Sequence, residues 1–174
     1  MSTLERDKQI LDLIVRTYYF QFEFRERLDG KLNNFIAITG TISTLSIGVA
    51  LFVLERVSTR NPYYIPLTVT FFVYLGLFVS AMIIGLKGYK PTKFTWYPED
   101  PERLIKDYSK FSSEIEVIRV VAASFANATN TNKDMNNRKS RICNYVFWLL
   151  IFGVLAVVLF AIFMVLALGI PVGP

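Results

Sequence analysis

The stretch NYVFWLLIFGVLAVVLFAIFMVLAL, residues 144–168, decides the fold, because it contains 25 consecutive residues without a charge. It belongs to a run of 33 uncharged residues that follows Arg141. A helix needs about 20 apolar residues to cross the hydrocarbon core of a bilayer. A helix on the surface of a soluble protein would carry charges on its outward face, and this stretch carries none. The stretch therefore predicts a transmembrane helix.

Two further stretches of the chain have the same character. No charge lies between Lys31 and Glu55, a gap of 23 residues, or between Arg60 and Lys87, a gap of 26 residues. We expect spans at about residues 35–54 and 65–86, joined by a short loop. The predicted fold class is therefore all-α, an integral membrane protein with three transmembrane helices in contact with membrane lipid.

The segment before the first span carries six Lys or Arg and six Asp or Glu. Ser2 and Glu5 form a capping box, and Leu11, Ile14 and Tyr18 recur at helical spacing. We expect an amphipathic helix in residues 1–32, lying along the inner membrane surface or packed on the rest of the cytoplasmic part. The predicted order continues with a transmembrane hairpin in 33–88, a cytoplasmic loop and helix in 89–141, and the third span with a short tail in 142–174.

The distribution of cations predicts the orientation in the cell membrane, because Lys and Arg accumulate on the cytoplasmic side. Residues 87–141 contain eleven Lys or Arg, whereas the loop between the first two spans contains only Arg56 and Arg60. We expect the amino terminus and the segment before the third span in the cytoplasm, and the carboxy terminus outside.

Small residues recur every four positions in the first two spans. Such faces let helix backbones approach closely in lipid, and the predicted members are Gly40, Thr44 and Gly48 in the first span and Gly76 and Ser80 in the second. The alternative function of this surface is to line a pore. The hydroxyl groups that would do so belong to Thr39, Thr41, Ser43, Thr44 and Ser46.

Cations and aromatic residues alternate directly after the second span. This mixture suits the headgroup level of a membrane, and the predicted interface anchors are Lys87, Lys90, Lys93, Trp96 and Tyr97. Asp100, Pro101 and Glu102 then have the character of a helix start. We expect a helix from Glu102 that runs toward the third span.

A heptad seam follows in this predicted helix, with spacings that alternate between four and three residues, as in a coiled coil. Its members are Leu104, Tyr108, Phe111, Ile115, Ile118, Ala122 and Phe125. So narrow a seam needs a partner, either the amino-terminal helix of the same chain or the same helix of a neighbour. Together with the small-residue faces it predicts a homo-oligomer, and the cytoplasmic helices also offer a surface to a protein partner.

Beyond Phe125 the seam positions turn polar, at Thr129, Asn132 and Asn136. Two interpretations remain open for this portion. Either it is helical with hydrated faces, or the Asn-rich stretch loosens into a turn.

The composition excludes most enzymatic chemistry. The chain has no histidine and a single cysteine, Cys143, which leaves no ordinary zinc site, haem ligand pair or His-activated nucleophile. No ionisable residue lies within a span, which disfavours ion-coupled carriers. Cations near membrane ends account for the net charge of +5 without nucleic acid. We expect no enzyme activity, no catalytic residue, no metal and no cofactor.

Asn132, Asn136 and Lys139 form the pattern N-x-x-x-N-x-x-K directly before the last span. With the preceding hairpin and helix, this layout resembles small prokaryotic multi-span membrane proteins of unassigned function. It is also loosely similar to the SLATT-type two-span effectors of bacterial antiphage signalling, which implies an oligomer that disrupts the membrane when a nucleotide sensor fires. We expect a non-enzymatic, oligomeric, signal-responsive membrane effector or pore. The alternative is a scaffold or accessory subunit of a larger complex.

Overall fold

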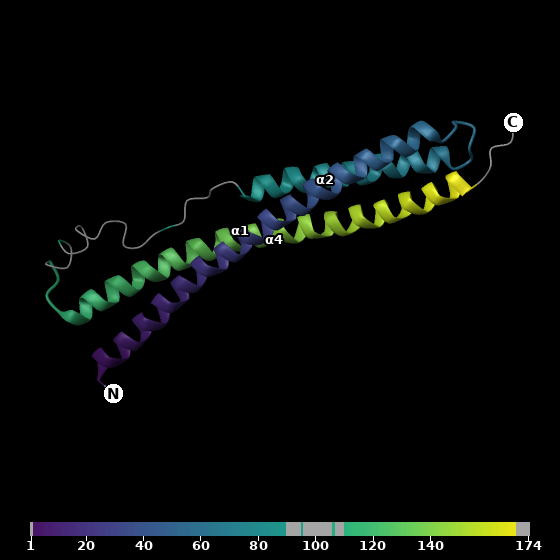
Figure 1. The fold of residues 1–174 in the computed structure, drawn as a ribbon. Coiled ribbons are helices and arrows are strands. Elements are labelled where there is room, and N and C mark those ends of the chain that lie inside the picture. The colour runs from purple at the N-terminus through teal and green to yellow at the C-terminus, as the bar shows by residue number, and fades with distance from the viewer. Residues whose placement is uncertain (1, 90–94, 96–105, 107–109, 170–174) are drawn as a thin grey trace. The chain divides into compact units, whose positions relative to one another are not determined.

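Three long helices make up most of the described chain (Figure 1). The computed structural model describes residues 2–89, 95, 106 and 110–169, in which α1 spans Thr3–Arg56, α2 spans Tyr64–Tyr89 and α4 spans Glu114–Gly169. Within these residues the structure contains no strand, so the all-α fold class is confirmed for them. Each helix contains an apolar stretch long enough to cross a membrane.

The helix starts follow from local chemistry. The Glu5 backbone N–H donates to Ser2 Oγ at 3.2 Å, so α1 begins at the predicted capping box. At the start of α2, the backbone N–H of Tyr63 donates to Asn61 Oδ1 at 2.9 Å. Pro66 lies in the first turn of α2, where its missing N–H has no intrahelical partner to lose.

The predicted boundary near residue 32 does not interrupt α1, which continues through Gly30 into the first apolar stretch. A glycine inside a helix costs about 1 kcal/mol relative to alanine. The flanking Leu28 and Leu32 are both buried, and burying a leucine contributes about 1.5–3 kcal/mol. Packing on both sides therefore outweighs the weak break at Gly30.

The predicted helix start at Asp100, Pro101 and Glu102 lies outside the described residues. The prediction that the helix runs from there without interruption is wrong, because residues 110–113 are not helical and α4 begins at Glu114. Ser113 and Glu116 form a second capping box that stops the helix from extending backwards. The Glu116 backbone N–H donates to Ser113 Oγ, and Glu116 Oε2 accepts from the backbone N–H of Ser112, both at 3.3 Å. From Glu114 the helix continues without a break through the third apolar stretch to Gly169.

The chain divides into two units, each described here by itself. The first unit comprises residues 1–29 and 91–140, and the second comprises residues 30–90 and 141–174. In the first unit, α1 and α4 run in the same direction, since Asp7 contacts Arg119 and Asp29 contacts Lys139. The charged sequence of α1 thus lies beside the Asn-rich sequence of α4.

The second unit packs its three helix segments through glycines and aromatic rings. A Cβ placed on Gly153 would lie 2.5 Å from the ring of Phe78, and one on Gly88 would lie 2.6 Å from Ile142. The Tyr74 and Phe160 rings meet edge to face with centroids 5.7 Å apart. Only glycine permits these approaches, which is how apolar helices gain contact area in lipid.

The surface of the second unit is apolar. Among the described residues, 25 of the 30 exposed large hydrophobic side chains belong to this unit. An exposed apolar surface of this extent is unfavourable in water and suits a hydrocarbon environment. The three helices are therefore compatible with a multi-pass membrane protein.

Candidate functional site

The first unit buries polar side chains where α1 meets α4. It holds six of the eight buried polar or charged residues in the described part of the chain. We call the central group the polar seam, and its members are Tyr18, Gln21, Asp29, Thr95, Asn132, Asn136 and Lys139. Burying polar groups is unfavourable unless they are hydrogen-bonded. The partners of each member therefore decide what the seam can do.

Asn132 binds the backbone of Thr95 at two points. Its Oδ1 accepts the Thr95 backbone N–H at 3.0 Å, and its Nδ2 donates to the Thr95 carbonyl oxygen at 3.1 Å. The Tyr18 hydroxyl donates to the same carbonyl at 3.2 Å. Because Asn132 is 0% exposed, water does not replace these partners. The side chain thus recognises the backbone N–H and carbonyl at position 95, which every residue type except proline provides.

Asn136 joins the two helices one turn further along. Its Nδ2 donates to the Gln21 carbonyl oxygen at 2.8 Å and to Gln21 Oε1 at 3.0 Å. Both side chains are buried. A paired amide at a buried helix contact favours one register, because any shift leaves polar groups without partners.

Lys139 completes the pattern as a buried cation. Its Nζ forms an ion pair with Asp29, whose other carboxylate oxygen lies 3.8 Å from Nε of Arg25. The Lys139 side chain is 8% exposed and that of Asp29 is 32% exposed. The ammonium group is the more desolvated partner, so it depends on the carboxylate more than the reverse.

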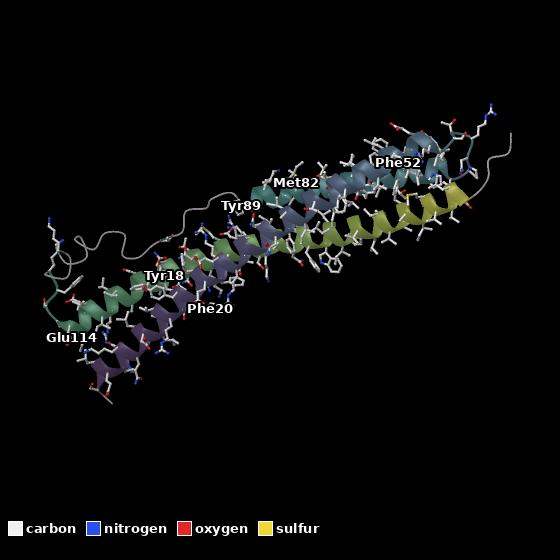
Figure 2. All side chains as sticks on the ribbon, in the orientation of Figure 1. Tyr18, Phe20, Phe52, Met82, Tyr89 and Glu114 are labelled. Carbon is white, nitrogen blue, oxygen red and sulfur yellow. The ribbon has the colours of Figure 1, made fainter. Side chains whose placement is uncertain are left out.

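The apolar part of this contact flanks the polar one. Tyr18 and Ala128 form a small buried cluster, against which Phe22 and Phe125 pack. The Tyr18 and Phe125 rings meet edge to face with centroids 5.3 Å apart. Figure 2 shows Tyr18 on the side of α1 that faces α4, whereas Phe20 lies on the other side and is exposed.

Of the two sequence interpretations of the Asn-rich portion, the turn is wrong and the helix is confirmed, although its hydration does not extend to Asn132 and Asn136. The portion is helical, and Asn132 and Asn136 are 0% and 2% exposed rather than hydrated. The signal was present in the sequence, because Thr129, Asn132 and Asn136 continue the seam spacing of Phe125. It was missed because amide side chains are usually assigned to the solvated face, and their partners Gln21 and Thr95 are distant in the chain.

The predicted heptad seam is only partly within the described residues. Phe111 precedes α4, whereas Ile115, Ile118, Ala122 and Phe125 lie on it, and Leu104 and Tyr108 fall outside the described part. Of the two predicted partners, the structure places the amino-terminal helix of the same chain against Phe125. The role of this seam in self-association stays a prediction.

The predicted small-residue faces contribute little to packing within one chain. Thr44, Gly48 and Gly76 are exposed, and a Cβ on either glycine would meet nothing within 4 Å. A Cβ on Gly40 would lie 3.8 Å from Met82, in ordinary van der Waals contact, and Ser80 is half-buried. The close approaches lie elsewhere, at Gly85, Gly88 and Gly153. An intermolecular use of the predicted faces stays a prediction.

Of the predicted interface anchors, Lys87 is an exposed residue near the end of α2. The other four, Lys90, Lys93, Trp96 and Tyr97, lie outside the described residues. In the part of the chain that the structure describes, no three His, Cys, Asp or Glu residues gather to hold a metal ion. The chemistry that the polar seam offers is therefore hydrogen bonding and charge pairing between helices.

Comparisons with protein-family models, with curated proteins and with solved structures find no match to this chain.

Proposed function

We propose that the protein is a non-enzymatic, oligomeric, signal-responsive membrane effector or pore, with the first unit as its cytoplasmic side. The observation that carries this proposal is the continuity of two helices. α1 and α4 each contain both polar-seam residues and an apolar stretch long enough to span a bilayer. Any rotation or shift of these helices at the seam has a continuous helical path into two of the three spans.

The composition of the polar seam supports a change of packing. A buried hydrogen bond contributes only about 0.5–1.5 kcal/mol net, because water replaces the partner once the group is exposed. Opening a seam of amides and charges therefore costs less than opening an apolar seam of equal area. If two packing arrangements of α1 and α4 differ in free energy by a few kcal/mol, a ligand or partner that binds one of them better can shift the protein toward that arrangement.

The alternative function, a scaffold or accessory subunit, is favoured by a different observation. Hydroxyl groups of the first apolar stretch are engaged within their own helix. Thr39, Thr41 and Thr44 donate to the carbonyl oxygens four residues earlier at 2.6, 3.0 and 2.9 Å. Hydroxyl groups bonded in this way are less available to coordinate permeating ions than free hydroxyl groups would be. The exposed Ile10, Leu13 and Phe20 on α1 would then receive the protein partner.

Release of dye from liposomes distinguishes the two functions. Purified protein is reconstituted, and dye release is compared for the unmodified chain, Asn132→Leu and the exposed control Lys133→Gln. If the protein is an effector, we expect Asn132→Leu to change the leak rate by about tenfold, which corresponds to a change of about 1.4 kcal/mol in the equilibrium between two arrangements. The control Lys133→Gln should leave the leak rate unchanged. Absence of leak for every variant, at every protein density, would support the scaffold.

The proposed orientation is tested by thiol labelling in a Cys143→Ser background. A cysteine at Ser58 should react with a membrane-impermeant reagent in intact cells, and one at Ser112 only after permeabilisation. The opposite pattern would reverse the orientation. Self-association is tested by mass measurement in mild detergent and in nanodiscs, where a monomer under both conditions would contradict the proposed oligomer.

A further inference from the structure

The second unit contains an apolar pocket of about 180 Å³ between its three helices. Residues from α1, α2 and α4 line it, namely Leu45, Ser46, Val49, Tyr74, Val157, Phe160, Ala161 and Met164. Two of these residues, Tyr74 and Phe160, are buried, and their rings pack edge to face. We propose that this pocket binds one acyl chain of a membrane phospholipid.

The chemistry of the wall excludes polar ligands. The Tyr74 hydroxyl is engaged, because it donates to the Ser46 carbonyl oxygen at 3.1 Å. No lining residue carries a charge. Beside the Tyr74 hydroxyl, only the Ser46 hydroxyl is polar, so a polar ligand would lose more hydration here than it gains in hydrogen bonds. The space is sufficient for an apolar ligand, since an engineered cavity of about 150 Å³ lined by aliphatic and aromatic residues binds benzene.

The depth of the pocket selects an acyl chain among apolar ligands. Val49 lies seven residues before the end of α1, Tyr74 ten residues after the start of α2, and Phe160 nine residues before the end of α4. At 1.5 Å per residue these positions are about 10–15 Å from the helix ends. A hydrocarbon core is about 30 Å thick, so this depth is that of acyl methylenes and not of headgroups.

The mouth of the pocket opens to the surroundings of the second unit. Leu45 and Val49 line it and are 67% and 51% exposed. In a bilayer those surroundings are lipid, so the pocket is filled without any passage through water. An empty pocket would leave its walls without dispersion contacts on one side, and an inserted chain restores them.

This inference rests on the proposed membrane location, and the test separates the two. The full chain is placed in phosphatidylcholine nanodiscs that contain a phosphatidylcholine with a diazirine near the middle of one acyl chain. After illumination, labelled residues are mapped by mass spectrometry. Labelling of Val49 and Met164 is expected to exceed that of the exposed residues Leu51 and Val158 by about fivefold, the population ratio given by about 1 kcal/mol.

Two variants that fill the pocket sharpen the test. Ala161→Leu places a larger side chain inside it, and Leu45→Phe covers its mouth from an exposed position that packing does not constrain. Each is expected to lower the labelling of Met164 by about fivefold, whereas the matched control Val158→Leu leaves it unchanged. Retention of folded helix is checked by circular dichroism.

Four results would overturn the inference. Even labelling of all four residues would mean that the pocket holds no preferred chain. Unchanged labelling of Met164 in both filling variants would exclude the pocket as the site. If the filling variants instead reduce the oligomeric mass and leave the labelling unchanged, a side chain of a second copy occupies the space. If none of the four residues is labelled, including the exposed Leu51 and Val158, the membrane location itself is refuted.

Discussion

The two units of this protein bring their helices together with opposite chemistry. In the first unit, α1 and α4 meet through amides and an ion pair, including Gln21, Asn136 and Lys139. In the second unit, the helices meet through glycines and rings, including Phe78 and Gly153. The exposed surfaces of the two units also differ in character. Of the 30 exposed large hydrophobic side chains among the described residues, 25 lie in the second unit.

The difference is the one that water and lipid would each require. In water, apolar burial supplies most of the free energy of helix pairing, and buried polar pairs add specificity of register. In lipid there is no hydrophobic drive between apolar helices, so close van der Waals contact has to replace it. The contrast therefore supports placing the first unit in water and the second in a bilayer.

The largest expected effect concerns the buried charge of the polar seam. Asp29→Ala leaves the Lys139 ammonium desolvated and unpaired, and we expect the free energy of unfolding to fall by about 3 kcal/mol. Lys139→Met removes the desolvated charge itself, and Asp29 keeps Arg25 nearby, so a loss below about 1 kcal/mol is expected. Dodecyl sulfate titration in mixed micelles, followed by circular dichroism, measures both. If Asp29→Ala and Lys139→Met lower the free energy of unfolding equally, the Lys139 ammonium group is hydrated and does not depend on Asp29.

The next effect tests the glycine contacts of the second unit with one substitution at two sites. Gly153→Ala places a Cβ 2.5 Å from the Phe78 ring, and we expect overpacking to cost about 2 kcal/mol. Gly48→Ala meets nothing within 4 Å in one chain, and no loss is expected. Thermal unfolding in detergent compares the two variants. A lower oligomeric mass for Gly48→Ala would instead identify a contact between copies.

A smaller effect tests the recognition of backbone by Asn132. Thr95→Pro removes the N–H that donates to Asn132 Oδ1, and we expect a loss of about 1–2 kcal/mol from the orphaned acceptor. Thr95→Ala keeps the backbone groups, so its free energy of unfolding should stay within about 0.5 kcal/mol of the unmodified chain. The same micelle titration serves as the measurement. Equal behaviour of the two variants would argue against the contact.

The smallest effect concerns an exposed ion pair in the first unit. Arg16 and Asp12 lie 2.8 Å apart, with side chains 77% and 60% exposed. Arg16→Ala should change the free energy of unfolding by no more than about 0.5 kcal/mol, and the change should vanish in high salt, because water and ions screen the pair. A loss of unfolding free energy comparable to that of Asp29→Ala would mean that solvent exposure does not explain the difference between this ion pair and the Lys139–Asp29 pair.

The sequence by itself determined the three apolar helices, because the absence of charge over 23 to 33 residues is a local property that no distant contact alters. It also determined the start of α1, since Ser2 and Glu5 are three residues apart. The same rule applied to Ser113 and Glu116 would have located the start of α4. The prediction of an unbroken helix gave more weight to the absence of Gly and Pro than to this second capping box.

Only the tertiary structure decided which partners the polar residues find. Asn132 and Asn136 have the same side chain as Asn137, yet the first two are buried and the third is exposed. The partners of the buried pair, Thr95 and Gln21, lie 37 and 115 residues away in the chain. The glycine contacts are decided in the same way, since Gly153 and Gly48 differ only in what a neighbouring helix places beside them. Helix formation depends on nearby residues, whereas the value of a buried amide or a missing Cβ depends on the opposite surface.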